Sequence, residues 1–155
     1  MTMATPDELR LTLPAAHSVE AKARAALRQH ALDAALPEDE LTLLEFVASE
    51  LVSNAVDHGG GLGVREEADS TFGAQMHVRL RVTSEEWILS VADMGGGDPD
   101  VVREHIASGE EPDVEGFRGR GLYLLAQMLD RFEVERSRDG RGLQFIASKR
   151  WGAPA

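Results

Sequence analysis

Three polar side chains that could do chemistry, Glu50, Asn54 and His58, recur at four-residue spacing in a largely apolar stretch of the sequence. Because an α-helix turns about 100° per residue, each four-residue step advances only about 40° around the helix axis. On the predicted helix, Asn54 falls within the apolar arc and Glu50 lies at its edge. Burying an unpaired amide costs roughly 1–3 kcal/mol, and an unpaired carboxylate costs more. We therefore expect a polar partner beside this helix.

The partner of Glu50 and Asn54 can be of two kinds. Backbone groups of a neighbouring element are the simpler choice, and for a single buried asparagine they are at least as common as any ligand. Alternatively, carboxylate and amide oxygens one helical turn apart suit a hard cation such as Mg²⁺, with a water or hydroxyl beside it. The helix alone leaves both interpretations open.

A second segment, Asp93-x-Gly95-x-Gly97, follows an apolar run from Trp87 to Ala92 that predicts a central strand. A carboxylate held at the end of a strand can accept a hydrogen bond from an exocyclic amine, such as that of adenine. The glycines allow the chain to bend and a ligand to approach closely. An ordinary strand-to-turn junction gives the same pattern, so this signal is weak alone.

A third segment, Gly119-Arg120-Gly121, precedes a helix predicted from about Leu122. Backbone amides at a helix N-terminus bind phosphates well, and Arg118 and Arg120 could add charge-assisted hydrogen bonds. A flexible loop before a helix is the plain alternative. Neither glycine segment matches the phosphate loop of P-loop enzymes or the dinucleotide-binding fingerprint.

The elements that must position these segments follow from the apolar periodicity. Strands are predicted at residues 9–13, 74–82, 87–92, 132–134 and 143–147, the last two joined by a hairpin turn at Asp139-Gly140. Helices are predicted at about 18–35, capped by Ser18, at 37–58 and 100–107, and from 122, with glycine-rich loops at 59–73 and 109–121. His17 and His30 are expected on the surface of the first helix. Strands that come in hairpins favour an α+β fold: a two-layer sandwich with helices on one face of a mixed, mostly antiparallel sheet.

Composition narrows the functional classes. A chain of 155 residues is expected to form one domain over residues 1–155, with its core at about 9–147. The absence of cysteine favours a cytoplasmic protein without thiol chemistry. A formal net charge of -11 argues against direct nucleic-acid binding. No apolar run suggests a signal peptide or a membrane span.

Taken together and in this order, the three segments resemble the GHKL ATPase superfamily, and most closely its anti-sigma-factor serine/threonine protein kinases. The matching stretches are Glu50–Gly59, Asp93–Gly97, and Gly119–Leu122 followed by Met128–Asp130. The resemblance implies a Bergerat-type ATP-binding fold, with ATP and Mg²⁺ as cofactors. It covers nearly the whole chain, from about residue 9 to 147.

Roles for individual residues follow from the resemblance alone. Asn54 would ligate Mg²⁺, and Glu50 would be the catalytic general base that takes the proton from a serine or threonine hydroxyl. Asp93 would hold the adenine amino group, with Gly95 and Gly97 shaping the pocket floor.

The third segment would hold the phosphates, through Arg118, Gly119, Arg120, Gly121 and Leu122, beneath a lid formed by residues 109–118. His58 matches the histidine of the first family motif, but a cap at the negative end of the helix dipole explains it equally well. Many members carry a threonine near adenine in the last hairpin. Here residues 140–143 read Gly-Arg-Gly-Leu, without a hydroxyl.

The implied function is an ATP-dependent protein kinase that acts as an anti-sigma factor and phosphorylates an anti-sigma-factor antagonist in a partner-switching pathway. A sigma factor would be a second partner, and a homodimer is expected. Two alternatives stay open: a switch kinase that activates a phosphatase, and a non-catalytic regulator whose binding is gated by nucleotide.

Overall fold

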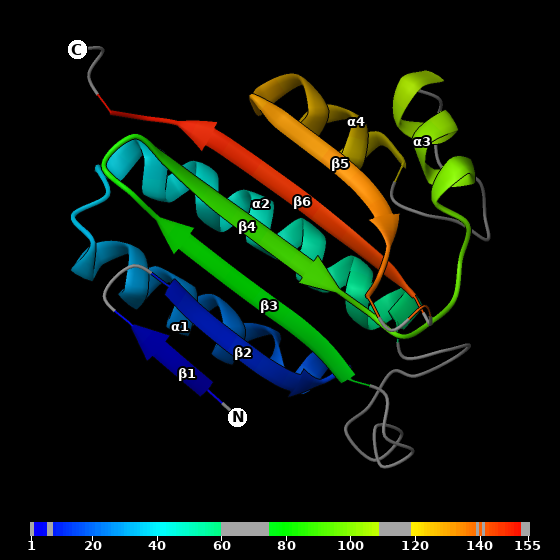
Figure 1. Cartoon of the computed structure of the whole chain (residues 1–155), viewed down its shortest axis with the longest axis horizontal. Helices are drawn as coiled ribbons and strands as arrows, with labels where there is room; N and C mark the ends of the chain where they lie inside the picture. The colour runs from blue at the N-terminus through cyan, green and yellow to red at the C-terminus, as the bar shows by residue number, and fades with distance from the viewer. Residues whose placement is uncertain are drawn as a thin grey trace.

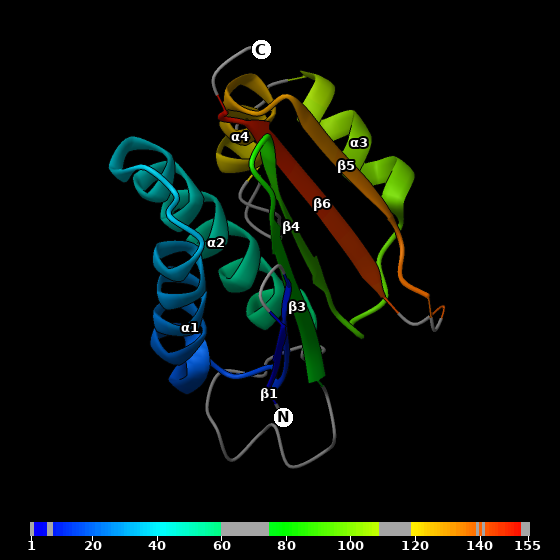
Figure 2. The same ribbon diagram turned by 60° about the vertical axis from the view of Figure 1, so that its left-hand side comes forward.

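The fold is a six-stranded sheet with helices packed against one of its faces (Figures 1 and 2). The computed structural model describes residues 2–5, 8–59, 75–108, 119–138, 140 and 142–152. The strand order is β1-β2-β3-β4-β6-β5, and every neighbouring pair in it is antiparallel. The predicted α+β sandwich is confirmed, and its described strands form an antiparallel rather than a mixed sheet.

The strands are β1 (Thr2–Thr5), β2 (Glu8–Pro14), β3 (Gln75–Val82), β4 (Glu86–Ala92), β5 (Arg131–Arg136) and β6 (Leu143–Arg150). The helices are a short 3₁₀ turn η1 (His17–Val19), α1 (Glu20–Asp33), α2 (Glu38–Gly59), α3 (Pro99–Ser108) and α4 (Gly119–Met128). The sequence pattern did not predict β1, because its four residues show no apolar alternation.

Alternation along β3 divides the sheet into two unlike faces. Met76, Val78, Leu80 and Val82 are buried, whereas the residues between them are exposed. Since successive side chains of a strand point to opposite faces, one face of the sheet packs under the helices and the other carries polar groups. The register preserves this division across strands, because Leu80 lies opposite buried Leu89 of β4.

Helix α2 is fixed over the sheet at its beginning and ends beside the end of β4. Its first turn is acidic, which suits the positive end of the helix dipole. The fully buried Trp87 donates from Nε1 to Glu40 Oε1 at 3.2 Å, and so ties the start of α2 to the start of β4. Figure 1 shows α2 and β4 running in the same direction, so their last residues lie at the same side of the molecule.

The first helix differs from its prediction in two respects. Ser18 lies inside η1, and α1 begins after Val19 with no side-chain capping hydrogen bond, so Ser18 is not its cap. His30 is buried, with 9% of its surface exposed, rather than a surface residue. The reason is its spacing from Ala23 and Leu27, which places it on the face of α1 that packs against α2.

The last third of the chain forms the β5 edge of the sheet and the two helices that pack beside it. Helix α3 packs against β5 and α4, and Arg103 Nη2 donates to the carbonyl oxygen of Val134 at 2.6 Å. This bond occupies a backbone acceptor on the edge strand, which would otherwise be open to another chain. The predicted β5–β6 hairpin is confirmed by the pairing of Arg136 with Leu143, whereas Asp139 in its turn lies outside the described residues.

Among the described residues, no helix combines the length and the apolarity that crossing a membrane requires.

Candidate functional site

The amide of Asn54 is buried in α2 without a hydrogen-bond partner among the described residues. Only 2% of the residue is exposed, and both Oδ1 and Nδ2 are enclosed and unpaired there. One turn earlier on the same helix, Glu50 is half-buried, and its Oε2 is likewise enclosed and unpaired within the described part of the chain. Within that part, backbone groups of neighbouring elements do not satisfy these atoms.

The local sequence explains why these polar atoms are enclosed. Leu51, Val52, Ala55 and Val56 surround them in sequence and are all at most 3% exposed. Helix α2 packs against β3, β4, β6 and α4, so that most of its circumference is covered. Because buried polar groups without a partner cost free energy, these atoms, which lack one among the described residues, make this part of α2 the candidate ligand site.

Asp93 is held at the end of β4 by the backbone of β6. It is 5% exposed, and its Oδ1 accepts hydrogen bonds from the amides of Gly95 at 3.1 Å and Leu143 at 3.2 Å. The amide of Asp93 in turn donates to the carbonyl oxygen of Leu143 at 2.9 Å. The carboxylate therefore has a fixed position and direction, as recognition of a flat base requires.

The predicted glycines contribute in different ways. Gly97 adopts a φ of +94° and the intervening Gly96 a φ of +81°, in the left-handed region that side chains disfavour. Gly95 has no such φ, and its contribution is the amide that it donates to Asp93. The chain thus turns sharply just after the carboxylate.

Sequence reasoning missed Gly142 and Ser137. A Cβ atom on Gly142 would lie 2.3 Å from both the carbonyl oxygen and Oδ1 of Asp93, so only glycine fits there. Its amide donates to the hydroxyl of buried Ser137 at 3.0 Å. The last hairpin therefore does place a hydroxyl near Asp93, from a position outside residues 140–143. The contact between Gly142 and Asp93 joins residues distant in sequence, so no local pattern could have revealed it.

The third segment forms the beginning of α4. The helix starts at Gly119 rather than near Leu122, so Gly119, Arg120 and Gly121 occupy its first turn. The first amides of a helix have no partner within it and are free to bind an anion. Leu122 is fully buried and anchors this turn to the core, so its side chain is not exposed to a ligand.

The other predicted positions lie outside the described part of the structure. Arg118 and the lid at 109–118 lie outside the described residues, as do the side chains of Arg120 and His58. The structure thus brings the end of α2 and the end of β4 to the same end of the molecule, and packs α2 against α4. No cluster of three or more His, Asp or Glu side chains that could hold a metal ion occurs among the described residues.

Residues 13–147 match the model of the histidine kinase-like ATPase domain family. The chain belongs to this family, which confirms the resemblance seen in the three motifs. Among solved structures, it is similar to a chain of the SiaB–SiaC complex from Pseudomonas aeruginosa. That match has 16% sequence identity and a TM-score of 0.62, and it covers 92% of this chain and 89% of the other. This likeness shows the fold. No curated protein sequence matches the chain significantly.

Proposed function

We propose that this protein is an ATP-dependent serine/threonine protein kinase that acts as an anti-sigma factor. Its substrate would be an anti-sigma-factor antagonist, with a sigma factor as the alternative partner in a partner-switching pathway. The observation that carries the proposal is the buried amide of Asn54, which has no partner among the described residues and lies one turn from Glu50 on a helix of an ATPase-family domain. The choice of a protein substrate is supported by the motif resemblance. It is also supported by the SiaB–SiaC complex, in which a chain with a similar fold is bound to a second protein.

The chemistry of Asn54 fits Mg²⁺ delivered with a nucleotide. Mg²⁺ prefers oxygen ligands and commonly takes only one or two from the protein, the others coming from phosphates and water. The enclosed Oδ1 of Asn54 is an oxygen without a partner among the described residues. When bound, the ion would neutralise charge on the phosphates during phosphoryl transfer.

The other residues would position the nucleotide and the acceptor. Glu50 would accept the proton of the acceptor hydroxyl, since phosphoryl transfer requires chiefly positioning and an oriented nucleophile. The fixed carboxylate of Asp93 would accept a hydrogen bond from the adenine amine. The first-turn amides of α4 would bind phosphate oxygens.

The proposal is tested by incubating the protein with ATP, Mg²⁺ and antagonist proteins that co-purify with it, and mapping phosphoserine and phosphothreonine by mass spectrometry. The informative variant is Glu50→Gln, which keeps the shape of the side chain and removes its basicity. We expect the variant to bind ATP as the wild type does and to lose about 10²-fold or more in transfer rate.

Three outcomes separate the alternatives. Transfer that survives Glu50→Gln unchanged would reject the assigned base. Partner capture that depends on Mg·ATP but leaves no phosphate on the partner would favour a non-catalytic, nucleotide-gated regulator. Transfer to a protein whose phosphorylation activates a phosphatase would favour a switch kinase. Homodimer formation belongs to the same proposal, and sedimentation velocity tests it.

A further inference from the structure

The face of the sheet that points away from the helices carries a depression formed by two cavities. Two cavities, of about 480 and 280 Å³, lie on it and share Arg79, Ser90, Arg138 and Gln144 in their linings. They therefore form one continuous depression, which also includes Arg10 and Arg81 and which we call the open-face trough. No described helix lies over this face in Figure 1.

The trough is cationic although the chain is strongly acidic. Its lining includes four arginines, from β2, β3 and the residue after Ser137, and two carboxylates, those of Asp93 and Glu135. The whole chain, by contrast, has a formal net charge of -11. A local cluster of guanidinium groups on such a protein creates a confined region of positive potential.

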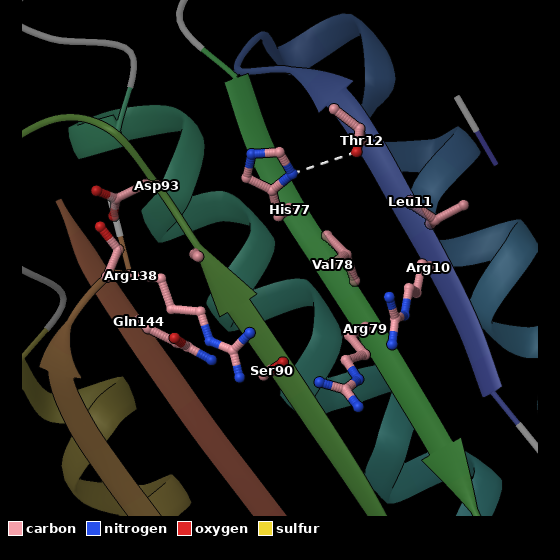
Figure 3. A pocket seen from close by; sticks show the side chains of 12 residues that line it. Arg10, Leu11, Thr12, His77, Val78, Arg79, Ser90, Asp93, Arg138 and Gln144 are labelled. Carbon is pink, nitrogen blue, oxygen red and sulfur yellow. Dashed lines mark hydrogen bonds between the residues drawn. The ribbon is translucent and has the colours of Figure 1, made fainter. Parts of the chain in front are cut away.

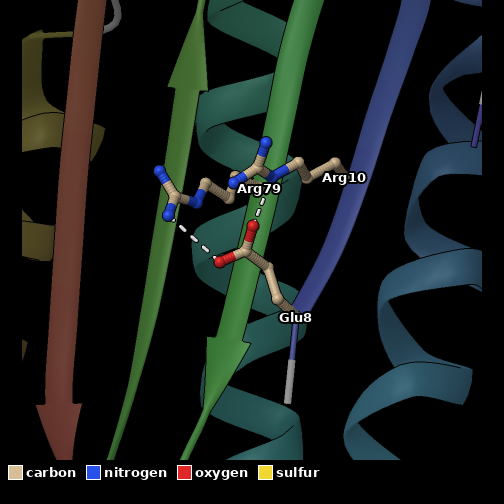
Figure 4. A network of polar contacts seen from close by, with 3 residues as sticks. All are labelled: Glu8, Arg10 and Arg79. Carbon is tan, nitrogen blue, oxygen red and sulfur yellow. Dashed lines mark hydrogen bonds and ion pairs between the residues drawn. The ribbon is translucent and has the colours of Figure 1, made fainter. Parts of the chain in front are cut away.

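Two of the arginines share one carboxylate beside the trough. Glu8 pairs with Arg10 through Oε1 and with Arg79 through Oε2, the latter at 3.0 Å (Figure 4). Hydrogen bonds from Arg10, and next from Arg79, lower the pKa of Glu8. Since one carboxylate balances only one guanidinium, this trio retains a net positive charge.

The other two arginines are available to a ligand. Neither the Arg81 nor the Arg138 side chain has an ion-pair or hydrogen-bond partner within the described ranges. Figure 3 shows the guanidinium of Arg138 extending toward Ser90 and Gln144 on the middle strands. These neutral groups can donate or accept hydrogen bonds beside the charge.

The shape of the trough indicates the kind of ligand. Pockets for small molecules enclose most of the ligand surface, whereas this depression lies open on a sheet face. The trough crosses β2, β3, β4 and β6. Because neighbouring strands lie about 4.8 Å apart, its width across these four strands is roughly 14 Å. An extended polypeptide of about four residues has this length. A polypeptide segment laid across the strands matches these dimensions better than a small anion.

We propose that the open-face trough binds an acidic segment of a partner protein, whose carboxylates pair with Arg81 and Arg138. A second copy of this chain docked face to face would bring guanidinium groups against guanidinium groups, which disfavours self-association through the trough. The trough lies on the other side of the sheet from α2. Asp93, which the proposed function assigns to adenine, also lines the trough, but Arg81 and Arg138 have no part in the proposed nucleotide site, so the inference goes beyond the proposed kinase activity.

The test is a fluorescence anisotropy titration with a fluorescein-labelled hexaglutamate peptide and, as the neutral comparison, hexaglutamine. The variant Arg81→Gln/Arg138→Gln removes the two trough charges that lack a partner among the described side chains. Its matched control, Lys22→Gln/Arg24→Gln, removes the same charge from the exposed surface of α1. We expect saturable binding of hexaglutamate that weakens at least about fivefold in the trough variant and less than about twofold in the control.

Several results would overturn the proposal. These are no saturable binding of hexaglutamate up to about 1 mM, equal weakening in both variants, and equal binding of hexaglutamine. Inorganic phosphate that binds more tightly than the peptide, and at the same two arginines, would mark a small-anion site instead. A dimer that dissociates in Arg81→Gln/Arg138→Gln would assign the face to a second copy of the chain.

Discussion

Gly142 lies against Asp93 so closely that a Cβ atom at position 142 would be 2.3 Å from both the carbonyl oxygen and Oδ1 of Asp93. The adjoining amide of Leu143 donates to the same Oδ1 at 3.2 Å. The backbone of the last hairpin therefore sets the position of the carboxylate that we assign to adenine, and a substitution there should act on nucleotide binding through Asp93.

Gly142→Ala is expected to weaken binding of a fluorescent ATP analogue by about tenfold, because the added methyl group must displace Asp93 or the hairpin. The control is Gly140→Ala in the same hairpin. Gly140 has a φ of +74° but no atom within 4 Å of its added Cβ, so that variant meets backbone strain without touching Asp93. Equal effects of the two variants on affinity would contradict the assigned role of Gly142.

Asn54→Leu is expected to raise the stability of the nucleotide-free protein while abolishing its stabilisation by Mg·ATP. The substitution replaces a buried amide that has no partner in the described part of the chain with an apolar side chain of similar size, which should recover about 1–3 kcal/mol. For a domain of this size, that corresponds to a rise in Tm of a few degrees.

Calorimetric melts with and without Mg·ATP measure both effects of Asn54→Leu, with Ser53→Ala as the half-buried neighbouring control. A lower Tm for Asn54→Leu without nucleotide would show that the amide has a structural partner. Such a result would contradict its assignment to a ligand.

The Glu8 ion pairs predict a pH dependence of stability. Because hydrogen bonds from Arg10 and Arg79 lower the pKa of Glu8 in the folded state, its contribution is fully present above the unfolded-state pKa of about 4.3. That contribution is lost as the pH falls through the lowered pKa of the folded state. The wild type should therefore exceed Glu8→Gln in free energy of unfolding near pH 7 and converge with it toward pH 2.

Urea denaturation of the wild type and Glu8→Gln across this pH range provides the measurement. A difference that is constant with pH, or that widens on acidification, is incompatible with a lowered pKa of Glu8.

The two tryptophans should differ in their contribution to stability. Trp87 is fully buried and bonds Glu40 across the layers, whereas Trp151 is half-buried and donates to the carbonyl oxygen of Thr83 at 3.1 Å. Trp87→Phe is expected to cost about 2–3 kcal/mol, through lost packing and the lost bond, and Trp151→Phe less than about 1.5 kcal/mol. Urea denaturation followed by circular dichroism compares them, and the reverse order would contradict the proposed anchoring of α2 by Trp87.

Features with local periodicity could be predicted from the sequence. The four-residue spacing of Glu50 and Asn54 within an apolar helix correctly indicated enclosed polar atoms. The alternation in β3 correctly indicated a sheet with one polar face. The prediction of His30 as a surface residue is wrong, because its spacing from Leu27 places it on the buried face of α1 although its side chain is polar.

Contacts that depend on strand order could not be predicted. Gly142 contacts Asp93 only because β6 pairs with β4. These two strands are separated in the sequence by the segment that contains α3 and α4. The same strand order places Arg138 and Arg79 in the lining of one cavity, the open-face trough. The apolar pattern identifies strands and their faces, but it does not specify which strands become neighbours.

The most direct test of the nucleotide site is titration with a fluorescent ATP analogue, with and without Mg²⁺, on the wild type, Asn54→Ala and Ser53→Ala. If Asn54 ligates Mg²⁺ at an ATP site, the wild type and Ser53→Ala should bind the analogue more tightly when Mg²⁺ is present. Asn54→Ala should lose that enhancement. Binding that is independent of Mg²⁺ and unchanged by Asn54→Ala would contradict the assignment.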